Sequence, residues 1–155
     1  MSDTIVIGFG NTLREDDGAG VRAAELIRDA FPEIDVVTLH ELQPELAEKI
    51  SHYRTVVFID ARAGGNALSC AGVCADASWK PDDSHSQSPA CLLAASSALY
   101  NHCPDLAVMV GIPAFQFGFR ETLSPTTALM LPECAALVGR LLRRARMDDV
   151  VSAHC

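Results

Sequence analysis

Two aspartates, each close behind an apolar run, are the first candidates for chemistry in this sequence. Asp17 ends the segment GFGNTLREDD, which follows the apolar residues at 4–8, and Asp60 lies within the apolar run 55–61. Two carboxylates held close together repel each other, and a bound cation relieves that repulsion. If the fold brings Asp17 and Asp60 together, the pair therefore indicates a metal site.

The identity of a third ligand decides which metal fits such a pair. Two carboxylates alone suit magnesium or calcium, whereas a borderline metal favours an imidazole. His85 lies in the polar segment PDDSHSQSP ahead of an expected helix, and His40 lies at the end of an expected strand. His85 is the first candidate for the imidazole ligand and His40 is the second.

Other roles compete for the same acidic residues. Asp16 and Asp17 precede an expected helix, where carboxylates cap free N–H groups, and Asp60 suits a backbone hydrogen bond at the start of a loop. A dinucleotide site is a further alternative. The segment GFGNTL has Leu13 where the fingerprint has its third glycine, and the nearby carboxylates would repel a pyrophosphate.

The elements that must position these residues follow from the hydrophobic pattern. Ile- and Val-rich runs predict buried strands, and apolar residues at helical spacing predict helices. Strands are expected at 4–8, 34–40, 55–61, 71–75 and 106–112, and helices at 21–30, 44–53, 89–103 and 124–145. The prediction is one α/β domain of residues 1–147, followed by a flexible tail of residues 148–155.

Alternating strands and helices predict a three-layer architecture, with a mostly parallel, twisted central sheet of about five strands and helices on both faces. Right-handed crossovers favour the order 2-1-3 for the first three strands. Ligands in such sheets bind outside the carboxyl ends of the strands, where the order reverses. Asp17 and Asp60 are therefore expected to face one crevice.

Composition narrows the class of protein. The net charge of −8 disfavours a nucleic-acid partner, which would need clustered Lys and Arg. No apolar run reaches the roughly 18 residues of a membrane span, and the N-terminus lacks the pattern of a signal peptide. We expect no membrane partner, a cytoplasmic location and free thiols at the six cysteines.

Four segments in order resemble the hydrogenase maturation proteases, which trim the C-terminus of the [NiFe]-hydrogenase large subunit. They are GFGNTLREDDGAGV, FIDAR, SHSQSPACLLAASSALY and VGIPAFQFGFRETLSP. The resemblance implies a monomer that recognises nickel already inserted into the large-subunit precursor. It implies that Asp17, Asp60 and His85 form the metal-binding and catalytic centre.

A mechanism follows as a hypothesis. No GxSxG or HExxH motif is present, so a serine hydrolase or an ordinary zinc protease is disfavoured. Thiolates of the precursor would hold the nickel ion, and Asp17, Asp60 and His85 would complete its shell. The alternative is a non-catalytic nickel- or nucleotide-binding module that uses the same crevice.

Overall fold

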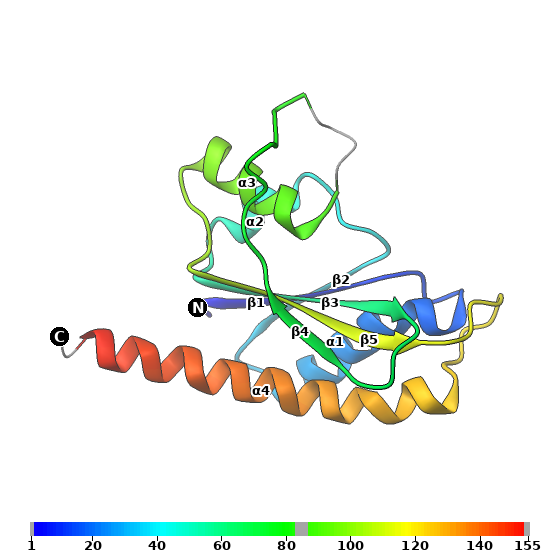
Figure 1. Cartoon of the computed structure of the whole chain (residues 1–155). Coiled ribbons are helices and arrows are strands. Elements are labelled where there is room, and N and C mark those ends of the chain that lie inside the picture. The colour runs from blue at the N-terminus through cyan, green and yellow to red at the C-terminus, as the bar shows by residue number, and fades with distance from the viewer. Residues whose placement is uncertain (1, 83–86, 154–155) are drawn as a thin grey trace.

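Five strands form a single sheet whose parallel core matches the predicted apolar runs (Figure 1). The computed structural model describes residues 2–82 and 87–153. The strands are β1 (Thr4–Phe9), β2 (Asp35–Leu39), β3 (Thr55–Ala63), β4 (Ser69–Gly72) and β5 (Leu106–Ala114). Their order is β2-β1-β3-β5-β4, so the predicted 2-1-3 arrangement is confirmed.

The helices confirm the predicted alternation. They are the 3-10 turn η1 (Glu15–Gly18), α1 (Ala19–Ala30), α2 (Leu46–Ile50), α3 (Pro89–Tyr100) and α4 (Pro125–Ala153). The helix α4 extends beyond the predicted end at residue 145. The division into a domain of residues 1–147 and a flexible tail stays a prediction.

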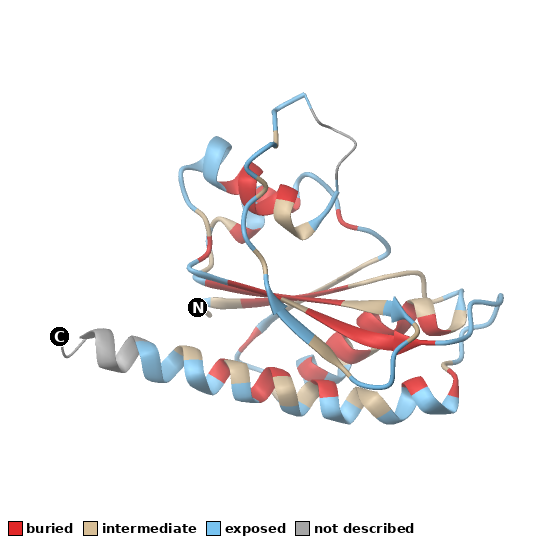
Figure 2. Ribbon diagram, in the orientation of Figure 1, coloured by how far each residue is buried: buried red, intermediate tan, exposed pale blue. Residues whose placement is uncertain are grey.

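Alternating strand residues divide the core into two clusters, one on each face of the sheet. Val6 and Val57 face α1 and α4, whereas Ile5, Val56 and Phe58 face α2 and α3. Figure 2 shows the buried residues concentrated in the strands and on the sheet-facing sides of the helices. The predicted three-layer α/β class is thereby confirmed.

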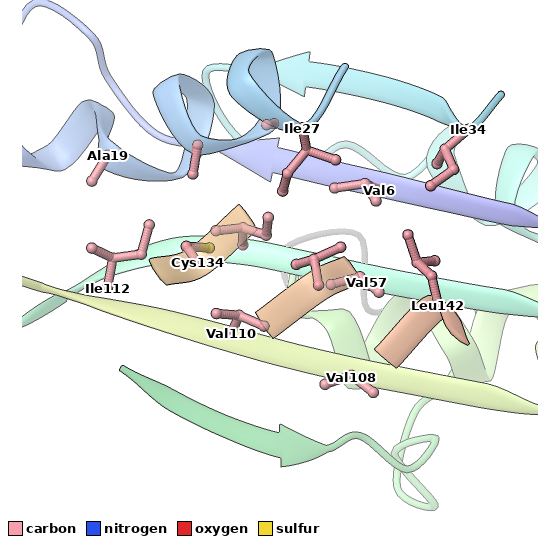
Figure 3. Close-up of a cluster of buried hydrophobic side chains, with 14 residues drawn as sticks. Val6, Ala19, Ile27, Ile34, Val57, Val108, Val110, Ile112, Cys134 and Leu142 are labelled. Carbon is pink, nitrogen blue, oxygen red and sulfur yellow. The ribbon is translucent and has the colours of Figure 1, made fainter. Parts of the chain in front are cut away.

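Figure 3 shows the cluster of buried side chains that lies between the sheet, α1 and α4. Val57 and Val110 point from the strands toward Ile27 of α1 and Cys134 of α4. All four side chains are fully buried. This packing fixes α1, and with it the turn η1 that precedes α1.

A glycine allows α1 to lie close against the sheet. A Cβ atom on Gly20 would lie 2.4 Å from the carbonyl oxygen of Ile59, a distance that real Cβ atoms do not show. The first turn of α1 can therefore touch the backbone of β3 only because residue 20 has no side chain.

The sheet has one antiparallel edge. The short strand predicted at 71–75 is found at Ser69–Gly72, where it pairs antiparallel with β5. Among the described residues, no helix has both the length and the apolar character that a membrane crossing requires.

Candidate active site

Asp60 lies in β3, near the carboxyl end of the parallel sheet. It pairs in register with Gly111 of β5, and the preceding residue Ile59 pairs with Gly8 of β1. The residue is partly buried, and its Oδ1 atom accepts a hydrogen bond of 2.8 Å from the amide of Ala61. Asp60 thus sits beside the end of β1, as the sheet order requires.

Asp17 lies in η1, which follows β1 after a short loop. Its Oδ2 atom accepts a hydrogen bond of 2.9 Å from the amide of Asn11. Gly10, with φ of +140°, lies between the two aspartates. A Cβ atom there would be 2.0 Å from the carbonyl oxygen of Asp17 and 3.7 Å from Oδ1 of Asp60. The structure therefore brings Asp17 and Asp60 to one place.

The two carboxylates interact electrostatically. Burial is the main cause that raises the pKa of Asp60, and the hydrogen bond from Ala61 opposes it. The charge of Asp17 raises that pKa further, and the result is about 6. A carboxyl group with such a pKa can release or accept a proton near neutral pH, which suits acid–base catalysis or metal binding.

The third predicted ligand cannot be placed in this geometry. His85 lies outside the described residues. His40, the second candidate, is exposed directly after β2. Within residues 2–82 and 87–153, no group of three His, Cys, Asp or Glu side chains is placed to hold a metal ion. The described part of the chain therefore contributes Asp17 and Asp60 as candidate ligands, and the role of His85 stays a prediction.

The prediction that Asp16 caps the following helix is wrong. Neither η1 nor α1 has a side-chain cap, and Asp16 is fully buried. Its carboxylate accepts hydrogen bonds from the amides of Phe115, Gln116 and Ser124 at 2.7–3.0 Å. The hydroxyl groups of Ser124 and Thr127 donate to it at 2.7 and 3.0 Å. Asp16 instead joins η1 to the start of α4.

The capping role weighed for Asp17 also finds no support, since α1 has no side-chain cap. Asp16 and Asp17 are adjacent carboxylates with separate environments. One is buried among donors from a distant segment, and the other is partly exposed beside Asp60. Sequence reasoning missed the role of Asp16, although the polar run SPTT was a signal that the start of α4 offers hydroxyl donors.

Further hydrogen bonds fix η1 against residues 115–120, the segment that leaves β5. The amide of Glu15 donates to the carbonyl of Arg120 at 2.8 Å, and its Oε2 atom accepts from the amide of Gly118 at 3.3 Å. The guanidinium of Arg14 donates to the carbonyl of Phe117 at 2.8 Å. The residues just before Asp17 are therefore fixed to the segment that follows β5.

The dinucleotide alternative fits this geometry poorly. In a dinucleotide site the glycine backbone must be open so that a pyrophosphate can approach it. Here the carbonyl of Asp17 lies against Gly10 in that space. The glycines of the GFG segment thus accommodate the protein's own backbone.

Three of the thiols are poor candidates for a nucleophile. Burial raises the pKa of Cys70, and burial together with the charge of Asp105 raises that of Cys103. Burial, with a smaller contribution from Cys70, raises the pKa of Cys134 to about 12. Because the thiolate is the reactive form, these shifts leave the three groups inert near neutral pH.

Comparison with known proteins was made at the levels of sequence and structure. No family model matches the sequence, and no curated protein sequence matches it. The hydrogenase-maturating endopeptidase HybD from E. coli superposes with a TM-score of 0.73 over 94% of each chain, at 20% identity. This chain has the fold of the hydrogenase maturation proteases.

Two archaeal structures agree with that assignment. The [NiFe] hydrogenase maturation protease HycI from Thermococcus kodakarensis gives a TM-score of 0.65 at 22% identity, covering 90% of this chain and 92% of its own. HybD from Thermococcus kodakarensis gives 0.61 at 16% identity, covering 91% and 99%. The maturation-protease fold that the four sequence segments predicted is therefore confirmed.

Proposed function

We propose that this protein is a nickel-recognising endopeptidase that removes the C-terminal peptide of a [NiFe]-hydrogenase large-subunit precursor after nickel insertion. The observation that carries the proposal is the carboxylate pair formed by Asp17 of η1 and Asp60 of β3 in a chain with the maturation-protease fold. We further propose that it acts in the cytoplasm as a monomer.

In this proposal nickel arrives with the substrate. Thiolates of the precursor hold the ion, and Asp17, Asp60 and His85 complete its coordination. Nickel bound between the two proteins would orient the scissile peptide and polarise its carbonyl or acidify a water. Asp60, with a pKa of about 6, is suited either to lose its proton and bind the ion or to act as the general base.

A bridging ion explains how an unfinished precursor is rejected. Without nickel, the precursor lacks the ion that joins it to the two aspartates, and the mutual repulsion of the carboxylates is not relieved. The nickel-free precursor then binds weakly and is not cut. In this proposal, specificity therefore depends on whether the precursor carries nickel.

The test compares nickel-loaded and nickel-free precursor, each incubated with the purified protein. We expect mass spectrometry to show loss of the C-terminal peptide only from the nickel-loaded form. Equal cleavage of both forms would contradict the metal bridge. Binding of nickel without any mass loss would favour the non-catalytic nickel-binding module.

The first prediction concerns Asp17. We expect Asp17→Asn to reduce cleavage by at least about a hundredfold, since the amide loses the charge that binds the ion or drives proton transfer. Asp29→Asn is the matched control, because Asp29 is an exposed acid on α1. Circular dichroism should show the same fold for both variants. Normal cleavage by the Asp17→Asn variant would exclude Asp17 from the catalytic centre.

A further inference from the structure

Residues 115–120, which we name the aromatic loop, present an alternating row of phenylalanines. Phe115, Phe117 and Phe119 are 46%, 37% and 88% exposed, and Leu13, which precedes η1, is also exposed. Scattered apolar residues are normal on a protein surface, but three aromatic rings in one short segment are not. Figure 2 shows the segment after β5 as exposed.

The backbone of the aromatic loop is fixed by hydrogen bonds, while its three aromatic side chains stay between 37% and 88% exposed. The amides of Phe115, Gln116 and Gly118 donate to the carboxylates of Asp16 and Glu15. These bonds hold the backbone of the loop against η1. A surface that is held in shape before binding loses little conformational entropy when a partner arrives.

Two charged side chains of the neighbouring turn, Arg14 and Glu15, are already engaged by the loop, whereas the charges of Arg120 and Glu121 lie exposed at its end. Arg14 donates to the carbonyl of Phe117, and its guanidinium carbon lies 5.5 Å from the centre of the Phe119 ring. The Oε2 atom of Glu15 accepts from Gly118. What the loop offers to a partner is therefore mainly aromatic surface, which suits an apolar segment of polypeptide.

The aromatic loop is continuous with the candidate active site. It begins directly after β5, the neighbour of β3 in the sheet, and Asp60 of β3 pairs with Gly111 of β5. On its other side it is hydrogen-bonded to η1, which carries Asp17. Figure 1 shows this loop and the η1 region side by side at one end of the sheet. The aromatic loop and the carboxylate pair are therefore neighbours at this end of the sheet.

We propose that the aromatic loop is a docking surface for an apolar segment of the precursor polypeptide, next to the bond that is cut. This inference rests on the proposed function for the identity of its partner. A second copy of this chain is the less suitable occupant, because two chains of net charge −8 repel each other. Phe117 and Phe119 are the expected anchors, since buried aromatic residues dominate binding energy at interfaces.

The test uses nickel-free precursor as the probe, because its binding depends on the loop rather than on a metal bridge. We expect Phe117→Ala and Phe119→Ala each to raise its Kd by roughly tenfold. Phe119→Leu, which keeps an apolar side chain, should retain most of the affinity. Met147→Ala is the matched control, an exposed apolar residue near the other end of α4. It should leave the Kd unchanged.

The outcomes separate this inference from the proposed function. A Kd unchanged in both phenylalanine variants, or no binding by the wild-type protein, overturns the docking surface. So does a change of oligomeric state in sedimentation with an unchanged Kd, which would identify a second copy as the occupant. Weaker binding by the variants supports the docking surface even if nickel-loaded precursor is never cut, and in that case only the peptidase proposal fails.

Discussion

At the scale of single residues, the protonation of Asp60 links stability to pH. Burial and the charge of Asp17 raise its pKa to about 6, against the opposing hydrogen bond from Ala61. The folded state thus binds this proton more tightly than the unfolded state, whose aspartates titrate near 4. The resulting stabilisation is complete below pH 4 and is lost as pH rises through 6.

Asp60→Asn tests this linkage. We expect the variant to be more stable than the wild-type protein at pH 7.5 by about 1 to 3 kcal/mol, since it removes a carboxylate that is partly buried and faces Asp17. The gain should shrink toward pH 4.5. Urea denaturation at the two pH values measures it, and an equal gain at both would contradict the raised pKa.

Asp16 has the opposite dependence on pH. Burial raises its pKa, but hydrogen bonds from Phe115, Ser124 and Gln116 outweigh burial, so the pKa is lowered. Its contribution to stability is present above the unfolded pKa and is lost as pH falls through the folded one. At neutral pH the contribution of Asp16 to the stability of the fold is therefore fully present.

We expect Asp16→Ala to lower the free energy of unfolding by about 3 to 5 kcal/mol, because it leaves buried amide and hydroxyl donors without an acceptor. Chemical denaturation at pH 7 measures the change. Asp29→Ala, on the exposed side of α1, should change it by less than about 0.5 kcal/mol. Similar values for the two variants would show that the buried network contributes little.

At the scale of elements, the contact between α1 and β3 determines where η1 lies. Gly20→Ala places a Cβ atom 2.4 Å from the carbonyl oxygen of Ile59, and this backbone oxygen cannot rotate away. We expect a loss of about 1 to 3 kcal/mol despite the better helix propensity of alanine. Gly72→Ala is the control, with no atom within 4 Å of its Cβ position. Thermal unfolding that ranks the two variants equally would contradict the close approach.

At the scale of the whole molecule, α4 covers one face of the sheet along most of its length (Figure 1). Among the residues of α4 whose burial is described, which end at Asp148, Leu142 is the last buried one. We expect removal of residues 148–155 to change the free energy of unfolding by less than about 1 kcal/mol. Removal of residues 140–155 should lower it by at least about 2 kcal/mol, since Leu142 is lost. Equal thermal midpoints for the two truncated chains would contradict this.

Sequence patterns predicted the strands and helices well where burial is strong. The runs that became β1, β3 and β5 are buried on both faces and gave clear apolar signals. The strand β4 was predicted to begin two residues too late. Its residues are mostly exposed and give a weak apolar signal, and the strand is defined by its pairing with β5. Strand order followed from the handedness of crossovers, which depends little on individual side chains.

The sequence by itself determined the α/β class, the order of the first three strands and the meeting of Asp17 with Asp60, because apolar periodicity and chain handedness are local properties. Only the tertiary structure decided that Asp16 turns away from that pair toward Ser124, 108 positions along the chain. Local periodicity does not tell which of the two adjacent aspartates turns toward the distant SPTT run. Their environments differ because the packing of α4 and the loop after β5 brings donors to one carboxylate and leaves the other beside Asp60.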